Sequence, residues 1–250
     1  MLVRKILATL HLYPFRAALL VLALLSQAFP ATAAYAAPEA SADAALSKVL
    51  QQMDAASEKF KSARADFKWD QYTRVVDETD TQTGVIWFKR VGGATEMAAH
   101  INDQNGPGVA KELVYKNGNL QLYQPKIDDL KDYPAGKNNG QYESFLVLGF
   151  GGRGSDLQKN WTVTLQGMET LSDGAQKIQT AKLDLVPKQK SVSDMFTHIT
   201  MWVDTVRGIS LMQKSYEPSG DIRTATYSNI RYNEPSSVPD SAFKIQRKRK

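Results

Sequence analysis

The sequence of 250 residues contains no cysteine. A disulfide scaffold, a thiolate zinc site, a catalytic thiol and an acylated N-terminal cysteine are therefore excluded. Histidine is also scarce, and only His100 and His198 follow the first 36 residues. They lie far apart in the sequence, and neither has a metal-ligand partner at a typical spacing. We therefore expect no metal site and no cofactor.

The body of the chain carries no net positive charge, although the formal net charge of the whole sequence is +5. Arg4, Lys5 and Arg16 supply +3 near the start, and the basic tail, residues 247–250, supplies +4, which leaves −2 between them. A groove for nucleic acid needs basic residues spread over the folded surface, so no nucleic-acid partner is expected. The tail is expected to be a solvated terminus, and contact with anionic lipid headgroups is the alternative.

No apolar run reaches the length of a membrane-spanning helix. The longest, residues 17–28, is well short of the roughly 20 residues that such a helix needs. It follows a basic leader and precedes two small-x-small patterns, at residues 31–33 and 34–36. We predict a signal peptide over residues 1–36, cleaved near 33/34 or 36/37, and a mature protein in the periplasm. An uncleaved anchor helix is the alternative.

The remaining sequence predicts one domain, residues 37–246, of the α+β class and mainly β. Apolar residues recur every three or four positions from Leu46 to Phe60, which indicates an amphipathic helix. The period then changes to two, and Asn117-Gly118 marks a hairpin, so an antiparallel sheet is expected. Residues 127–132 look like a turn, and residues 142–149 and 155–160 like short helices. Strands are predicted at 63–74, 79–91, 94–101, 113–115, 120–123, 161–168, 177–186, 198–204, 208–216 and 222–231.

Catalytic motifs are not supported by their surroundings. The run Gly149 to Gly154 matches G-x-G-x-x-G, but a dinucleotide site needs a parallel strand before it and a long helix after it. Ser155 lacks the flanking glycines of a nucleophile elbow. We therefore predict no catalytic residue and no enzyme. A hydrolase whose two carboxylates meet only in the fold is a remaining alternative.

Apolar residues on the expected strands exceed what one covering helix needs. Most would ordinarily form core, but together they could line a cavity on a curved sheet. Apolar residues near the Gly-rich run would then form a lid, with Gly149, Gly151, Gly152 and Gly154 as its hinge. The candidate cavity residues are Phe67, Trp69, Val85, Trp87, Met97, Leu120, Leu122, Met201 and Met212, and the candidate lid residues are Phe145, Leu146, Leu148 and Leu157.

Several short motifs follow one another in a recognisable order after the leader and the helix. They are Ala65-Asp66-Phe67, Gly84-Val85-Ile86-Trp87-Phe88-Lys89, Tyr115-Lys116-Asn117-Gly118-Asn119-Leu120-Gln121-Leu122-Tyr123, Leu183-Asp184-Leu185-Val186-Pro187-Lys188 and Ile209-Ser210-Leu211-Met212. In this order the chain resembles the LolA-type outer-membrane lipoprotein carrier superfamily, over nearly all of its length beyond the leader.

The resemblance implies an incompletely closed antiparallel β-barrel with an N-terminal helix and a short helical lid. It also implies a monomeric periplasmic carrier or chaperone of acylated lipoprotein or lipid cargo, served by an inner-membrane donor and an outer-membrane acceptor. The alternative is an envelope module that senses lipid or binds a partner without carrying cargo. The family's third strand carries an arginine that ties down the lid, whereas residues 94–98 here contain none. Arg153 or another donor would have to replace it.

Overall fold

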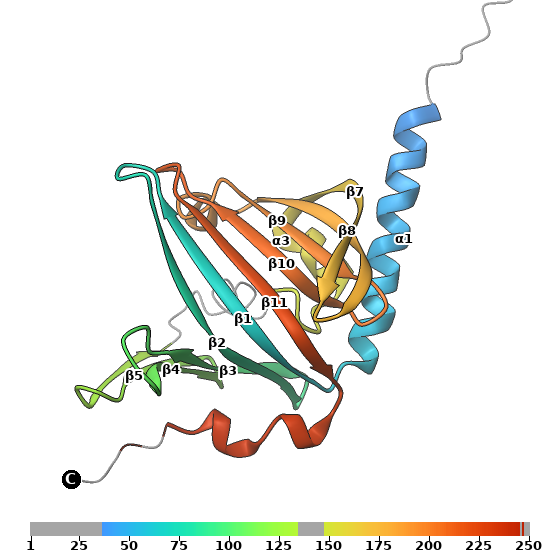
Figure 1. Cartoon of the computed structure of the whole chain (residues 1–250). Coiled ribbons are helices and arrows are strands. Elements are labelled where there is room, and N and C mark those ends of the chain that lie inside the picture. Colours follow the sequence, from blue (N-terminus) through green and yellow to red (C-terminus); the bar gives the residue numbers. More distant parts are fainter. Residues whose placement is uncertain (1–36, 135–147, 246, 248–250) are drawn as a thin grey trace, which may run out of the picture. The chain divides into compact units, whose positions relative to one another are not determined.

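A computed structural model describes residues 37–134, 148–245 and 247. In that part of the chain, an antiparallel sheet of eleven strands dominates the fold (Figure 1). Strand β1 (Ser62–Thr73) shows why the sheet forms, because its side chains alternate as the sequence predicts. Ala63, Ala65 and Phe67 are buried, while Lys68 between Phe67 and Trp69 is exposed.

The other elements complete the sheet and its cover. The strands are β2 (Glu78–Val91), β3 (Ala94–Asn102), β4 (Val109–Lys116), β5 (Asn119–Gln124), β6 (Asp129–Pro134), β7 (Trp161–Asp173), β8 (Gln176–Pro187), β9 (His198–Asp204), β10 (Ile209–Tyr216) and β11 (Ile222–Tyr232). The helices are α1 (Ala37–Lys59), α3 (Gly154–Asn160), α4 (Lys190–Ser193) and the 3₁₀ turns η1 (Pro235–Ser237) and η2 (Asp240–Phe243).

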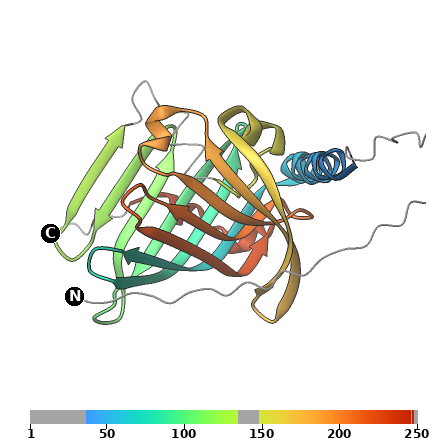
Figure 2. The same cartoon turned by 90° about the horizontal axis from the view of Figure 1, so that it is seen from above.

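The strand order is β6-β5-β4-β3-β2-β1-β11-β10-β9-β8-β7, and each neighbouring pair is antiparallel. The first strand therefore lies at the middle of the sheet, between β2 and β11. The sheet curls without joining its two edge strands, β6 and β7 (Figure 2). This mainly β, incompletely closed architecture confirms the predicted fold class.

The face of the sheet that carries Ala65, Phe67, Ile86, Met97 and Met201 is called the inner face here. Helix α1 covers the β7–β9 part of it, and Figure 1 shows the helix beside those strands. The helix residues Val49, Leu50 and Met53 are buried there against the sheet. The predicted three- and four-residue spacing thus produces the packing stripe that it indicated.

The opposite, outer face is covered in one region by the end of the chain. Phe243 is buried against Ala98 and Val114, and Trp87 packs against the same cluster. The indole nitrogen of Trp87 donates a hydrogen bond to the carbonyl of Ser237 at 3.1 Å. Strand β2 is apolar on both faces because it is sandwiched between this C-terminal segment and the inner-face core.

The differences from the sequence prediction are local. A turn was expected at residues 127–132. The turn covers residues 125–128, but strand β6 begins at Asp129 and pairs with β5, so the prediction is wrong for residues 129–132. The basic tail is not wholly a loose terminus, because the guanidinium of Arg247 forms two hydrogen bonds with the Asp128 carboxylate, at 2.9 and 3.0 Å. Residues 142–147 of the predicted helix at 142–149 lie outside the described residues. No helix in the described ranges combines the length and the apolar character needed to cross a membrane.

Candidate functional site: an apolar cavity on the inner face

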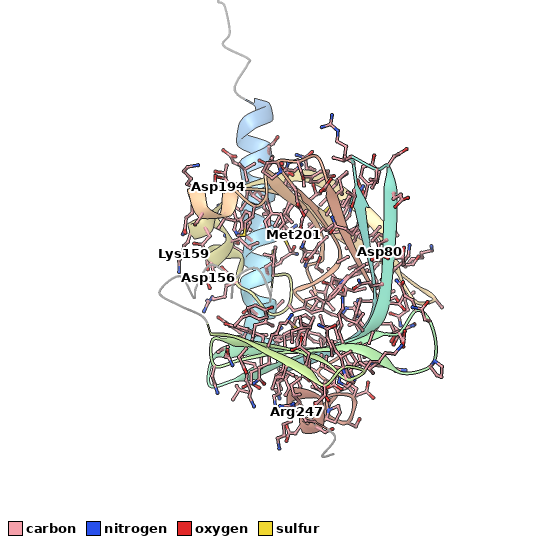
Figure 3. The ribbon with its side chains drawn as sticks, turned by 90° about the vertical axis from the view of Figure 1, so that its left-hand side faces the viewer. Asp80, Asp156, Lys159, Asp194, Met201 and Arg247 are labelled. Carbon is pink, nitrogen blue, oxygen red and sulfur yellow. The ribbon has the colours of Figure 1, made fainter. Side chains whose placement is uncertain are left out.

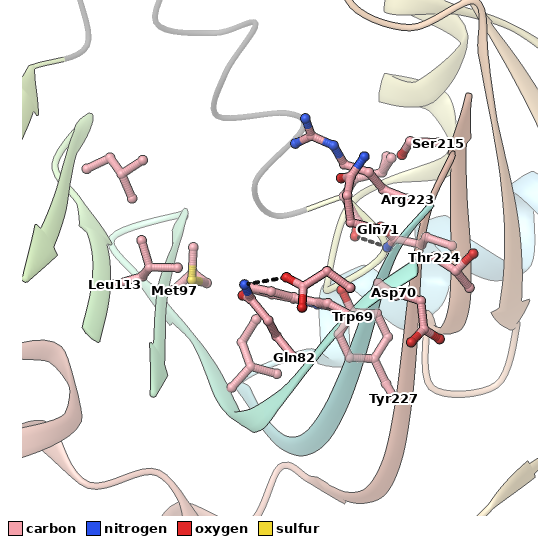
Figure 4. Close-up of a pocket in the computed structure, with 16 residues that line it drawn as sticks. Trp69, Asp70, Gln71, Gln82, Met97, Leu113, Ser215, Arg223, Thr224 and Tyr227 are labelled. Atoms are coloured by element: carbon pink, nitrogen blue, oxygen red, sulfur yellow. Dashed lines mark hydrogen bonds between the residues drawn. The ribbon is translucent and has the colours of Figure 1, made fainter. Parts of the chain in front are cut away.

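A cavity of about 440 Å³ opens on the inner face, over strands β1–β5, β10 and β11. Its volume lies within the range of about 300–1,000 Å³ typical of small-molecule sites. Figure 4 shows Met97 and Leu113 on one side of it and Trp69 and Tyr227 below. The apolar side chains that line it are Trp69, Ile86, Met97, Leu113, Leu120, Leu148, Ala225 and Tyr227.

The strand register places these side chains in rows across the sheet. Trp69 of β1 lies opposite Gln82 of β2 and Ala225 of β11. One row deeper, Phe67 lies opposite Gly84 and Tyr227. Because side chains of one face repeat every second residue, successive rows run from polar at the β1–β2 turn to apolar further in.

Aromatic rings form the floor of the cavity. Phe67 and Trp69 are stacked with ring centroids 4.1 Å apart. Beneath them, Phe88 and Phe150 are stacked at 3.9 Å, and Phe150 meets the ring of Tyr227 edge-on at 4.9 Å. Burial raises the pKa of the Tyr227 phenol well above its usual value, so the ring stays neutral at physiological pH. The floor is therefore rigid and uncharged.

The mouth of the cavity is polar. Gln71 of β1 lies opposite Asp80 of β2 and Arg223 of β11, and Arg223 lies opposite Ser215 of β10. All four line the cavity, and Figure 4 shows Gln71, Arg223 and Ser215 gathered on one side. Arg223 donates a hydrogen bond to the Glu217 carboxylate at 2.7 Å. The site therefore combines an apolar interior with a charged rim, an arrangement suited to an amphiphile.

The segment of residues 148–154 closes the inner end of the cavity and is firmly attached. Arg90, at the end of β2, donates hydrogen bonds to the carbonyls of Gly151 and Ser57, the latter at 3.1 Å. The Ser57 hydroxyl also donates to the Gly151 carbonyl, at 2.7 Å. Arg90 therefore connects β2 to this segment by hydrogen bonds. From the sequence, Arg153 or another donor was expected in this role, because residues 94–98 of the third strand contain no arginine.

The glycines of this segment allow close packing where a hinge was predicted. A Cβ atom on Gly151 would lie 2.3 Å from the Phe60 ring, and one on Gly154 would lie 2.4 Å from the Leu50 carbonyl oxygen. Gly151 also has φ of +73°, a conformation that favours glycine. In the described segment these glycines let the backbone touch α1 and its end, so they act as contact points.

The structure brings together four of the predicted site residues, Trp69, Met97, Leu120 and Leu148, around the cavity. Three others share the inner face without lining the cavity. Phe67 is buried under Trp69, Met201 is fully buried in the core beneath α1 (Figure 3), and Leu122 lies on β5 opposite the lining residue Leu113.

The remaining predicted residues lie elsewhere. Val85, Trp87 and Met212 face outward, because each sits one residue out of step with the inner-face positions Ile86 and Gln213. Leu157 is buried with α1 in the core and does not line the cavity. Phe145 and Leu146 lie outside the described residues.

The polar rim and four of the lining residues were not predicted from the sequence: Ile86, Leu113, Ala225 and Tyr227. The signal that could have found them is the hairpin register. The hairpin at Asn117-Gly118 places Leu113 opposite Leu122. Leu122 is two residues from Leu120 and therefore on the same face, so Leu113 belongs to the inner face once Leu120 is assigned to it. The pairing of β1 with β11 was not readable from local patterns.

Metal ligands are not clustered in the part of the chain that the structure describes. Within residues 37–134, 148–245 and 247, no three His, Asp or Glu side chains are placed to hold a metal ion. The nitrogen Nε2 of His198 lies 3.9 Å from the Asp184 carboxylate on the outer face, and its ring stacks on Tyr216.

This chain resembles known proteins only in its fold. No protein-family model matches the chain, and no curated protein matches it. Among solved structures, MucB has a TM-score of 0.50 at 14% identity, over 81% of this chain and 63% of MucB, so this chain spans less than two thirds of that protein. An outer membrane lipoprotein-sorting protein domain from Vibrio parahaemolyticus gives 0.45 at 11% identity, over 78% and 94% of the two chains.

A LolA superfamily protein from Nitrosomonas europaea is similar as well, with a TM-score of 0.39 at 13% identity, over 80% of this chain and 97% of that one. The likeness to MucB shows that this chain shares the fold of that protein. At these identities the likeness concerns the fold alone.

Proposed function

We propose that the protein binds the acyl chains of a lipoprotein or lipid in the inner-face cavity and carries them through the periplasm. The observation that carries this proposal is the cavity, whose interior is apolar and whose rim is polar. Such a site buries hydrocarbon and leaves a headgroup at the water boundary. The LolA-like fold is consistent with lipid or lipoprotein binding. The proposal includes no catalytic step.

The energetics suit a carrier. Each methylene removed from water contributes about 0.8 kcal/mol, so a chain of sixteen carbons represents roughly 12 kcal/mol of exposure. A carrier must offset much of this and still release its cargo. Met97 is the flexible side chain in the lining, and it can adapt to the position of a chain. Leu113 and Leu120 are partly exposed, so an acyl chain lying against them would remain partly in contact with solvent.

Binding is tested with a charge on the cavity wall. Leu113→Glu forces a carboxylate into an apolar site and should abolish binding of an apolar fluorescent dye and of lipid detected by native mass spectrometry. Met212→Glu is the matched control. Met212 lies on the outer face, two residues from Lys214. A folded Leu113→Glu variant that binds like the unmodified protein would contradict the cavity proposal.

Export is a separate part of the proposal. Residues 1–36 are proposed to be a signal peptide, which places the mature protein in the periplasm as a monomer. Intact-mass analysis of the exported protein should give a start near Ala34 or Ala37. Recovery of the full-length chain only from detergent extracts would instead support the anchor-helix alternative.

A lipid-binding carrier and a partner-binding module also differ in what they retain on purification. The carrier should co-purify with lipid when it is expressed with its leader. Its proposed partners are a donor protein in the inner membrane and an acceptor protein in the outer membrane. If the purified protein holds no lipid and binds no apolar dye, the partner-binding module becomes the better proposal.

A further inference from the structure

The rim of the cavity carries a carboxylate without a basic partner. Asp80 lines the cavity, and in the described ranges no lysine, arginine or histidine nitrogen lies within salt-bridge distance of it. Its carboxylate accepts long hydrogen bonds, both 3.4 Å, from the amides of Gln82 and Gln104. Asp103, by contrast, is paired with Lys126, and its carboxylate is largely buried in that pair.

The positive group of the rim lies two strands away. Asp80, Gln71 and Arg223 occupy directly opposed positions on β2, β1 and β11. Neighbouring strands are about 4.8 Å apart, so the backbones of Asp80 and Arg223 lie roughly 10 Å apart. Arg223 has a long side chain and Asp80 a short one, so a ligand lying above Gln71 would have to extend from the Arg223 guanidinium to the Asp80 carboxylate.

Arg223 is already balanced by Glu217, at 2.7 Å. With Asp80, the rim therefore carries net negative charge, which disfavours a ligand whose headgroup is only anionic. A headgroup with both a phosphate and an ammonium satisfies both ends. The phosphate accepts hydrogen bonds from the Gln71 amide and the Arg223 guanidinium, and the ammonium donates to Asp80.

We infer that the cavity takes a phospholipid with a phosphoethanolamine headgroup, its acyl chain lying against Met97, Leu113 and Leu120. This inference rests on the proposed function and narrows its cargo from acylated molecules in general to a zwitterionic phospholipid. The polar row at the mouth and the apolar rows behind it fix the orientation of the lipid, headgroup outward.

The test compares single-chain lipids that share one sixteen-carbon acyl chain and differ in headgroup. Displacement of an apolar dye is measured with lysophosphatidylethanolamine, lysophosphatidylglycerol and a monoacylglycerol. The protein should bind lysophosphatidylethanolamine about tenfold more tightly than lysophosphatidylglycerol. This is the order of magnitude expected for one charge-assisted hydrogen bond. Asp80→Asn should reduce this ratio to about one.

Asp77→Asn is the matched control for overall charge. Asp77 lies in the β1–β2 turn at the same end of the sheet, does not line the cavity, and has a positive φ of 54° that asparagine also adopts. It should keep the tenfold ratio. Arg223→Gln should weaken the binding of both lysophospholipids by a similar factor, because both carry a phosphate.

The outcomes separate the two proposals. Equal affinity for the two phospholipids, or a preference that survives in a folded Asp80→Asn variant, overturns the headgroup inference while acyl binding stands. A loss of preference in Asp77→Asn as large as in Asp80→Asn would mean long-range charge alone, and would overturn the direct contact. If no lipid displaces the dye, the monoacylglycerol included, the proposed function fails and the headgroup inference falls with it.

Discussion

The two halves of the inner face carry similar apolar residues and differ in what covers them. Under α1, Leu183, Leu185 and Met201 are fully buried, in a core that they form with Val49, Leu50 and Met53 of the helix. On the other half, Trp69 and Leu113 remain partly exposed around the cavity. One helix covers one half, so the same alternating pattern produces a close-packed core on one side and an open cavity on the other.

The difference also appears in the charged groups. The covered half is held at its turns by Arg207, which pairs with Asp204 at 2.6 Å and with Asp173 at 2.9 Å, all three largely buried. The charged groups beside the cavity, such as Asp80 and Arg223, are exposed. Buried networks fix one arrangement, whereas an exposed rim can exchange its partners for a ligand.

The largest expected effect comes from breaking the buried network. Arg207→Met leaves two buried carboxylates without their cation, and the free energy of unfolding should fall by about 3–5 kcal/mol. Burial lowers the pKa of Arg207, but the hydrogen bonds to Asp204 and Asp173 outweigh it and raise the pKa, so the charge persists at any working pH. Urea unfolding measures the change.

Arg153→Met is the control for this variant. Arg153 is half-exposed and lies 3.6–3.9 Å from Glu58 and Asp54. Exposed pairs contribute about 0–1 kcal/mol, so this variant should lose little stability. Equal losses in the two arginine variants would show that the buried Arg207 network contributes no more stability than an exposed pair.

The second test removes the same atoms from each half. Leu183→Ala, in the filled core, should lower the free energy of unfolding by about 2–5 kcal/mol, because the core beneath α1 cannot collapse around the gap. Leu113→Ala should cost less, because one side of Leu113 already faces the cavity. Similar losses at both positions would mean that the open half is as closely packed as the covered one.

This comparison also explains what the sequence could and could not predict. The open antiparallel sheet was predictable, because alternation of two and turn residues such as Asn117-Gly118 are local signals. The cover of each face was not. Met201 and Met97 both sit on inner-face strand positions, and only the placement of α1 makes one core and the other cavity lining.

The errors on β2 have the same origin. Val85, Ile86, Trp87 and Phe88 are consecutive apolar residues, so periodicity gives no register there. Trp87 looked like a lining residue, but it packs against the C-terminal segment through Phe243, a residue about 150 positions away in the chain. Contacts of that range are set by tertiary packing and leave no local pattern.

A third test concerns the tie between the halves. Arg90→Met removes the hydrogen bonds to Gly151 and Ser57, and loss of charge-assisted bonds should cost about 1.5–3 kcal/mol in local stability. Amide hydrogen exchange of residues 148–154 should become faster, while exchange in β8 and β9 stays slow. Unchanged exchange in the segment would show that Ser57 and the close contact of Gly151 with Phe60 hold it without Arg90.

The smallest expected effect is a pH dependence on the outer face of the open half. Burial raises the pKa of Asp70, but hydrogen bonds from Lys68 and Thr81 outweigh it and lower the pKa below its ordinary value of 3.8. Such a group stabilises the fold above its unfolded pKa, and the contribution is lost as the pH falls through the lower folded value. The Asp70→Asn variant should therefore be less stable than the unmodified protein at pH 7, by less than about 1 kcal/mol for so exposed a pair. The difference should shrink as the pH falls from 3.8 through the lower folded pKa of Asp70, because below that pKa both proteins are neutral at this position. Urea unfolding at several pH values measures it, and a difference that stays constant into acid would assign the effect to lost packing or to the Thr81 hydrogen bond, which an asparagine oxygen can also accept.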